Sequence, residues 1–264
     1  MQFQDLAESN PKSSETSGKR YPYEDTMKTA WMLTASLLAL SATAQMNPEQ
    51  TASTVTKSPL KRIATTGQVT TYSMVVETEF GGSPLRYTAD LVETVKEAAG
   101  STIVVSSEQK NGVVVIGGNE MPAPGEIGAL TTMTVGPDGR VAALEGEMVD
   151  ASVRRMANLQ AFVYPSEAVG PGDKWEAKID ANGEQGTEAV EIGYEVTGVE
   201  TVDGALLFKV KVEAREASGS DPAQMSGTVW IHPATGQMHK YEGEWKDVPI
   251  AGQIISGKVS LVKK

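Results

Sequence analysis

Cysteine is absent from this chain of 264 residues, which also has only two histidines and 6% aromatic residues. Without cysteine the protein can form no disulfide, so its hydrophobic core must hold the fold together. The same absence excludes a lipid anchor on a cysteine and catalysis by a thiolate. Long apolar runs are also missing after the first 45 residues, so we expect no membrane-spanning helix in the rest of the chain.

Basic residues are fewer than acidic residues in this chain. The chain has 23 Lys and Arg residues against 34 Asp and Glu residues, which gives a formal net charge of −11. No cluster of basic residues offsets this balance. Because nucleic acid phosphates and anionic lipid surfaces repel an acidic protein, neither is expected as a partner.

A short apolar segment near the start is the clearest targeting signal in the chain. Met27–Ala44 has a positive residue, Lys28, and an uncharged, largely apolar run over 29–40. Ala42-Thr43-Ala44 then supplies small residues at a cleavage site. The run is shorter than the roughly 20 apolar residues that span a bilayer. We therefore expect a signal peptide, cleaved between Ala44 and Gln45, and a periplasmic or secreted protein.

Four segments are expected along the chain. Residues 1–26 are polar and look like a non-native or unstructured extension, so that Met27 is the expected start. The signal peptide follows at 27–44, and 45–58 is rich in Thr, Ser, Gln and Asn, which is typical of a flexible linker. Residues 59–264 form the expected single β-rich domain.

Period-two alternation dominates this domain and predicts strands with one buried face. From Tyr72 to Phe80 the even positions are mainly apolar and the odd positions mainly polar. Two-residue turn signals between such runs predict four hairpins, because Asn-Gly and Asp-Gly favour the positive φ angles of tight turns. These signals are Asn111-Gly112, Asp138-Gly139, Asp203-Gly204 and Thr235-Gly236.

Only one stretch has helical spacing, at 150–164. Asp150 can cap its start, and Pro165 ends it. Val153, Met156 and Ala157 recur at helical spacing. Arg154 and Arg155 face elsewhere and are expected on the solvated face.

An internal repeat flanks this helix. Residues 139–148 and 236–245 share the pattern G-x-[VM]-x-x-[LY]-E-G-E-[MW]. The repeat predicts two similar halves, about 66–148 and 174–263, around the central helix. The alternative is chance similarity, since turn chemistry makes glycine-rich hairpins look alike. The predicted fold class is therefore all-β, with mainly antiparallel meanders in a duplicated half-barrel or sandwich and one short central helix; whether the halves share one sheet stays open.

Turn and anchor motifs between and within the halves resemble those of a known group. They are Pro165, Val169, Gly172, Asp173 and Trp175, and then Pro233, Thr235, Gly236 and Met238. In this order the chain resembles uncharacterised secreted or periplasmic all-β proteins of Gram-negative bacteria. It is more remotely similar to the carriers of lipoproteins across the periplasm, the LolA/LolB-like half-barrels. That resemblance implies a curved sheet over a helix, with a concave apolar face able to hold an acyl chain.

Residues suited to catalysis are scarce. His232 and His239 flank the predicted turn at Pro233–Gly236, with no nucleophile motif and no obvious third metal ligand. We expect both to be exposed hairpin residues. Asp180–Gln185 departs from a calcium loop at its glycine position and is expected to form a hairpin turn. The paired carboxylates Glu145/Glu147 and Glu242/Glu244 are expected on solvated strand faces. The sequence thus predicts no catalytic residue, no metal site and no cofactor.

A binding protein is the first functional hypothesis. The inner face of the sheet would be either a plain core or a cleft for an apolar small molecule, and the 11 methionines suit an adaptable surface. The second hypothesis is a structural or interaction protein that pairs a strand edge with an envelope partner; a secreted hydrolase is the third. The oligomeric state is open. The candidate ligand-binding residues are Tyr72, Met74, Val76, Tyr87, Leu91, Phe208, Trp230, Tyr241 and Trp245.

Overall fold

A computed structural model describes residues 57–100, 102–123, 130–219, 222–250 and 253–264. The N-terminal extension, the predicted signal peptide and its cleavage site lie outside the described residues, as does nearly all of the linker at 45–58. Within the described ranges, no helix combines the length and the hydropathy that a membrane span requires.

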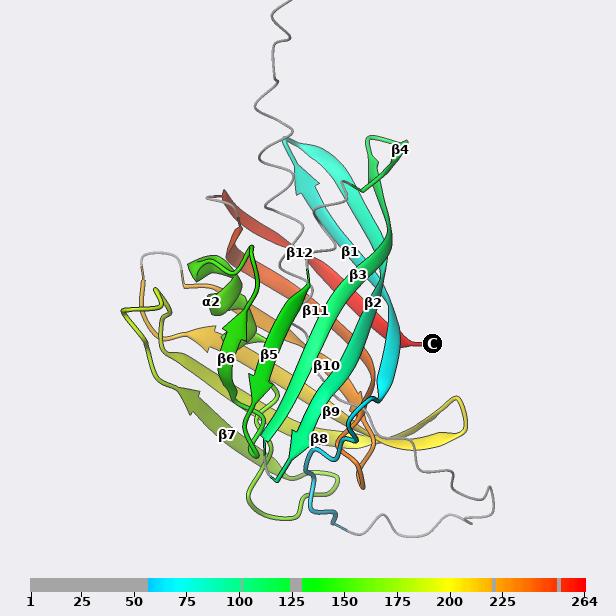
Figure 1. Ribbon diagram of the computed structural model, residues 1–264, viewed down its shortest axis with the longest axis vertical. Coiled ribbons are helices and arrows are strands. Elements are labelled where there is room, and N and C mark those ends of the chain that lie inside the picture. Colours follow the sequence, from blue (N-terminus) through cyan, green and yellow to red (C-terminus); the bar gives the residue numbers. More distant parts are fainter. Residues whose placement is uncertain (1–56, 101, 124–129, 220–221, 251–252) are drawn as a thin grey trace, which may run out of the picture.

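Twelve strands form one sheet, and every pair of neighbouring strands is antiparallel. Their order is β6-β5-β3-β2-β1-β12-β11-β10-β9-β8-β7, with β4 paired to β3 (Figure 1). The prediction of an all-β fold with one short helix is confirmed, and the two halves share a single sheet. The strands are β1 Val69–Phe80, β2 Ser83–Ala99, β3 Thr102–Ile116, β4 Asn119–Pro122, β5 Thr131–Val135, β6 Val141–Glu145, β7 Lys174–Ile179, β8 Val190–Val202, β9 Ala205–Glu216, β10 Gln224–Ile231, β11 Met238–Ile250 and β12 Gln253–Lys263.

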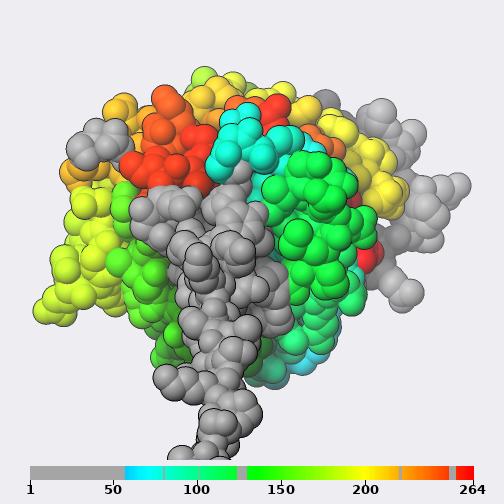
Figure 2. Space-filling view, turned by 90° about the horizontal axis from the view of Figure 1, so that it is seen from above, coloured from blue at the N-terminus to red at the C-terminus, as the bar shows by residue number. Residues whose placement is uncertain are grey.

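The two ends of the described chain close the sheet on one side. β1 pairs with β12, for example Met74 opposite Leu261, and Figure 2 shows the cyan N-terminal strands beside the red C-terminal ones. On the other side the edge strands β6 and β7 do not pair with each other. They approach closely enough for Arg140, just before β6, to donate a hydrogen bond from Nη2 to the carbonyl oxygen of Lys178 on β7, at 3.2 Å. The result is a half-barrel with one open seam.

The helix α2, Ala151–Leu159, connects the two edge strands in sequence. Asp150 caps it as predicted, because its carboxylate accepts a hydrogen bond from the backbone N–H of Val153 at 2.9 Å. The helix is shorter than the predicted 150–164 and ends at the C-cap Gln160. Beyond it, residues 161–164 have no regular secondary structure and are hydrogen-bonded to neighbouring elements; we call them the seam segment.

Three of the four predicted hairpin turns are present, at 138–139, 203–204 and 235–236. The prediction at Asn111-Gly112 was wrong, because both residues lie within the continuous strand β3. Asn111 has a φ of 54° there, opposite an irregularity in the register of β2. Its side-chain amide donates to Asp90 Oδ2 at 3.1 Å. Since asparagine tolerates positive φ, one such residue produces a bulge as readily as a turn.

The repeat motifs occupy different places in the two halves. The first copy covers β6, the last strand before α2, whereas the second covers β11, which is followed by one more strand. That additional strand is β12, the partner of β1. In a true repeat, β12 would therefore have no counterpart after β6 in the first half. It is also the strand that joins the second half to β1.

Candidate functional site

All nine residues predicted for the inner face are buried. Eight of them belong to the main hydrophobic core, on the side of the sheet that α2 covers. These eight are Tyr72, Met74, Val76, Tyr87, Leu91, Phe208, Tyr241 and Trp245. The structure therefore brings the candidates from both halves onto one continuous surface.

Trp230 lies on the other face of the sheet, so its assignment to the inner face was wrong. Its cross-strand neighbours are Lys209 and Lys240, whose ammonium groups lie 5.3 and 4.4 Å from the ring centroid. Its indole Nε1 donates to Glu200 Oε2 at 2.8 Å, and this hydrogen bond lowers the pKa of the Glu200 carboxyl. Strand alternation explains the placement, since the adjacent Val229 faces the core. The lysine stems bury Trp230 on the outer surface.

Polar atoms without hydrogen-bond partners lie on β11 and at the residue just before it. Within the described structure they are the side-chain Nε2 of Gln237, the hydroxyl of Tyr241 and Nε1 of Trp245, and all three are buried. Burial raises the pKa of the Tyr241 hydroxyl, so this group stays protonated. Buried donors are nearly always hydrogen-bonded in folded proteins, which makes this row unusual.

Two glycines give the Tyr241 ring its position. A Cβ atom on Gly243 would collide with the Tyr241 hydroxyl, and one on Gly227 would lie 2.8 Å from the ring. The ring therefore lies flat along β11, over the paired Gly227 and Gly243 and toward Trp245. Gln237 lies just before β11, and from Met238 to Trp245 the strand covers seven residue steps, or about 23 Å.

Methionines contribute to the surrounding wall. Five of them are buried in the core, on four strands and on α2, and unbranched thioether side chains repack easily. They are Met74, Met133, Met156, Met225 and Met238.

Polar residues also occur on the inner face of the N-terminal half. Thr70, Glu93 and Gln109 are buried there, and Gln109 accepts a hydrogen bond from the Tyr87 hydroxyl at 2.7 Å. The hydroxyl of Tyr72 donates to the carbonyl oxygen of Met238 at 3.3 Å. The inner face is consequently amphipathic rather than purely apolar, a feature that the alternation pattern alone did not indicate.

Four aromatic residues fix the seam segment. Phe162 makes edge contacts with Tyr164, Trp175 and Tyr194 at 5.1, 6.1 and 5.1 Å. Trp175 stacks on Tyr194 at 4.7 Å and donates from Nε1 to the carbonyl oxygen of Val163 at 2.8 Å. Trp175 therefore packs at the start of β7 with its indole N–H satisfied.

Arg155 is not on the solvated helix face where the sequence placed it. Its Nε and Nη2 donate to both carboxylate oxygens of Glu216 on β9, at 2.7 and 2.5 Å. The Glu216 side chain has no exposed surface, and it also accepts from the backbone N–H of Ala223 at 2.9 Å. This ion pair joins α2 to the C-terminal end of β9.

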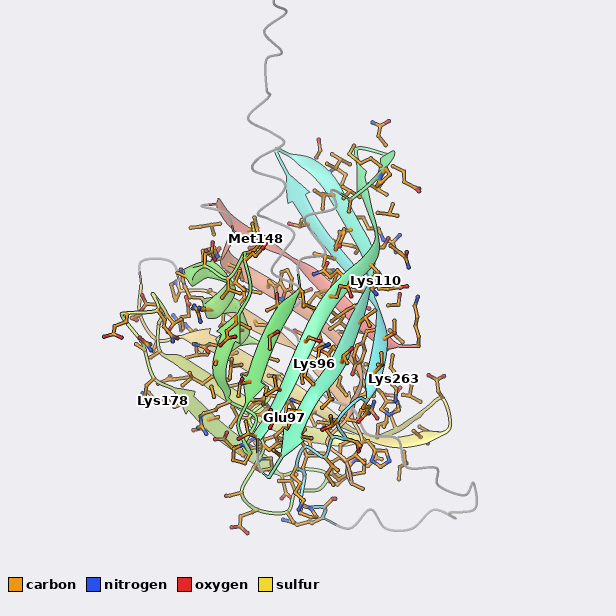
Figure 3. All side chains as sticks on the ribbon, viewed as in Figure 1. Lys96, Glu97, Lys110, Met148, Lys178 and Lys263 are labelled. Atoms are coloured by element: carbon orange, nitrogen blue, oxygen red, sulfur yellow. The ribbon has the colours of Figure 1, made fainter. Side chains whose placement is uncertain are left out.

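The two histidines are partly buried rather than exposed. Their ring centroids lie 6.5 Å apart, and Lys263, labelled in Figure 3, contributes positive charge nearby. Burial, and after it the positive charge of Lys263, lowers the pKa of His239 to about 4. The same two causes lower the pKa of His232. No group of three or more histidine, aspartate or glutamate residues gathers in a metal-binding arrangement within the part of the chain described.

Acid is expected to destabilise this end of the protein. Because the folded state holds His232 and His239 neutral at pH values where the unfolded chain protonates them, stability is complete above about pH 6.5 and decreases toward pH 4. Asp203 opposes the effect at His239 only weakly. Thermal unfolding followed by circular dichroism from pH 7 to 4 measures it. His239→Gln should reduce the slope, and an unchanged slope would contradict the assignment.

The outer face carries a polar groove of about 1220 Å³ over β1, β12, β11, β10 and β9. Charged side chains line much of it, including Glu77, Glu213, Lys246 and the pair Glu244–Lys258 at 3.7 Å. The exposed position of Glu244 agrees with the expected solvated strand face. Of the nine candidate residues, Trp245 alone lines this groove.

The fold and its inner surface define an antiparallel half-barrel closed by a helix and a seam segment. No protein-family model matches the chain, and neither does any curated protein. Among solved structures it is similar to the hypothetical lipoprotein YmcC of Escherichia coli (K12), with 12% identity over 73% of this chain and 84% of that one and a TM-score of 0.30. It is also similar to a putative exported protein with a YmcC-like fold from Bacteroides fragilis NCTC 9343, with 16% identity, 78% and 99% coverage and a TM-score of 0.34.

The first is described as a lipoprotein and the second as an exported protein. With TM-scores below 0.5, neither carries an argument about ligand or mechanism. Neither description names a lipoprotein carrier, and that resemblance stays a prediction.

Proposed function

We propose that this chain is an exported, non-catalytic binding protein of the cell envelope that holds an elongated, largely apolar molecule on the inner face of its half-barrel. One observation supports the proposal above all others: the buried, unpartnered donors of Gln237, just before β11, and of Tyr241 and Trp245 on β11, within a wall of apolar side chains. A ligand with a few hydrogen-bonding groups along an apolar body would satisfy these donors.

The proposed location rests on the predicted signal peptide, which directs the chain to the periplasm or beyond.

The proposed absence of catalysis rests on the surroundings of the two histidines. His232 and His239 face each other and Lys263 rather than a nucleophile and a carboxylate in the order that a catalytic triad requires.

Pairing through a strand edge is the competing hypothesis, and the two seam edges offer it little support. β6 has five residues and β7 has six, and β7 carries exposed Lys174, Glu176 and Lys178. Short edges with charged side chains are typical of proteins that prevent edge-to-edge association.

The direct test is to purify the protein from the periplasm of a Gram-negative host, extract it with organic solvent and identify the extracted molecules by mass spectrometry. A reproducible stoichiometric lipid or other apolar compound supports the proposal. Protein that is empty in repeated preparations, and that binds no added amphiphile, contradicts it. Recovery of uncleaved protein from the cytosol contradicts the proposed location.

Tyr241→Phe provides a sharper version of this test. Since the hydroxyl has no partner in the described structure, its removal should leave the melting temperature of the empty protein unchanged or higher. Ligand affinity should fall about 2- to 10-fold, the equivalent of one hydrogen bond of about 0.5–1.5 kcal/mol. Fluorescence titration and thermal unfolding measure the two effects.

Tyr194→Phe is the matched control, because the Tyr194 hydroxyl is fully used. It donates to the carbonyl oxygen of Ala161 at 2.8 Å and accepts from the N–H of Val163 at 2.9 Å. This variant should lower the stability of the empty protein without a specific loss of affinity. Equal behaviour of the two variants would contradict a ligand-directed role for Tyr241.

A further inference from the structure

The segment before β1 closes one end of the half-barrel. Ser58 forms an antiparallel bridge with Val169, and the N–H of Ile63 donates to the carbonyl oxygen of Thr235 at 2.9 Å. Leu60, between them, is 1% exposed and belongs to the core. The segment is thus built into the fold at the β10–β11 turn, close to where the row of unpartnered donors begins.

Arg62 projects its guanidinium into this closed end. Its backbone packs so tightly on Gly236 that a Cβ there would lie 3.0 Å from the Arg62 nitrogen. The side-chain atoms Nε and Nη2 are buried, and no acceptor in the described structure bonds to them. Glu93, Tyr72 and Tyr164 surround the group, and burial lowers its pKa despite the opposing effect of these neighbours.

The surrounding tyrosines do not use these donors. The hydroxyl of Tyr72 is directed to the carbonyl oxygen of Met238, and that of Tyr164 to the carbonyl oxygen of Gly236 at 3.0 Å. Gln237, the next residue, contributes a further buried donor without a partner, its Nε2. The closed end therefore presents charged and neutral donors, while the inner face of β11 beyond it is lined by Tyr241 and Trp245.

A buried guanidinium fork is the group best suited to hold a carboxylate or a phosphate, because two parallel N–H donors match two anionic oxygens. Burial of such a cation is unfavourable unless an anion accompanies it. The carboxylate of Glu93 lies in the same cluster and favours the charged form of Arg62, while Nε and Nη2 remain as donors for a second anionic group.

We propose that the bound molecule is a single-chain amphiphile whose anionic carboxylate or phosphate group pairs with Arg62, with its apolar chain along the inner face of β11. This inference rests on the proposed function and adds the charge and the orientation of the ligand. The part of β11 from Met238 to Trp245, about 23 Å long, is long enough for an extended chain of about 16 carbons.

The test uses delipidated protein from the periplasm and three probes: palmitate, methyl palmitate and 1-palmitoyl lysophosphatidic acid. Wild-type protein should bind palmitate or the lysophosphatidic acid at least 10-fold more tightly than the uncharged ester. Comparison of the two anions tells a carboxylate site from a phosphate site. In Arg62→Gln this preference should disappear, with affinity for the ester retained.

The outcomes separate the two claims. If wild-type protein binds the ester and both anions equally, or if Arg62→Gln keeps the preference, the anion site is wrong and the binding function stands. If no probe binds to wild-type protein, the proposed function fails, and the anion site fails with it.

Lys61→Gln is the control for charge alone, since Lys61 is the exposed neighbour of Arg62. Its anion preference should match that of the wild-type protein. Arg62→Lys, which keeps the charge and loses the planar fork, should retain part of the preference. Circular dichroism and thermal unfolding of each variant show that the fold is intact, and the ¹³C carboxyl shift of labelled palmitate reports directly on the ion pair.

Discussion

Replacing Glu216 with alanine is expected to lower the free energy of unfolding by about 3–5 kcal/mol, the range for removing one partner of a buried ion pair. The Glu216 side chain has no exposed surface and accepts hydrogen bonds from Arg155 and from the N–H of Ala223. Its loss would leave the guanidinium of Arg155 without its anion and release α2 from β9. Urea unfolding monitored by circular dichroism gives the difference directly.

Arg154→Ala is the matched control on the same helix, because no side-chain hydrogen bond or ion pair of Arg154 is present in the described ranges. Its backbone N–H, which the substitution keeps, donates to the carbonyl oxygen of Asp150 at 3.1 Å. Its effect should stay within about 0.5 kcal/mol. The double variant Glu216→Leu with Arg155→Met should be less destabilised than Glu216→Ala, since it leaves no buried charge unpaired. Equal losses in Arg154→Ala and Glu216→Ala would show that the buried pair contributes nothing specific.

Local signals predicted most of the strands and turns. Asp203-Gly204 forms its hairpin with φ angles of 50° and 79°, because the preference for positive φ belongs to those two residues alone. Asn111 has the same preference and produced a bulge, since the choice between a bulge and a turn depends on whether β2 continues beside it. Turn chemistry identifies where the backbone can deviate, and the neighbouring strand decides how.

Contacts between residues far apart in the chain could not be predicted from the sequence. Nothing near Arg155 indicates Glu216, which lies 61 residues away and becomes its partner only when β9 is in place. The closure of the sheet by β1 and β12 likewise depends on pairing between the first and the last strand. Composition and periodicity are properties of one segment at a time. They therefore predicted the strands, but the order of the strands in the sheet depends on which segments pair and stayed open.

The candidate site was predicted in part for the same reason. Tyr241 and Trp245 follow the alternation of one strand and were placed on the inner face. Arg62 was missed, because the segment before β1 has no period and its buried position depends on the β10–β11 turn. Trp230 was assigned to the wrong face although its neighbours Lys209 and Lys240 give it a stable position on the outer one.

The seam is where an antiparallel half-barrel of this order is weakest, since β6 and β7 share no strand pairing. The seam segment takes the place of a ladder: Tyr164 donates its N–H to the carbonyl oxygen of Asp138 at 2.8 Å on the β6 side, and Trp175 donates to Val163 on the β7 side. Hydrogen bonds of the seam segment, together with aromatic packing against Trp175, therefore stabilise this junction in place of a strand ladder.

Trp175→Ala is accordingly expected to destabilise the protein by about 3 kcal/mol, near the lower limit for truncating a large aromatic side chain, because Trp175 is only partly buried. Hydrogen exchange should show the loss first at the N–H groups of Val163 and Tyr164, with β1 and β12 protected for longer. Trp175→Phe keeps a ring against Tyr194 and loses only the bond to Val163, so about 1 kcal/mol is expected. Uniform loss of protection over the whole sheet in Trp175→Ala would contradict a local role, because it would mean that the seam and the closed side of the half-barrel unfold as one unit.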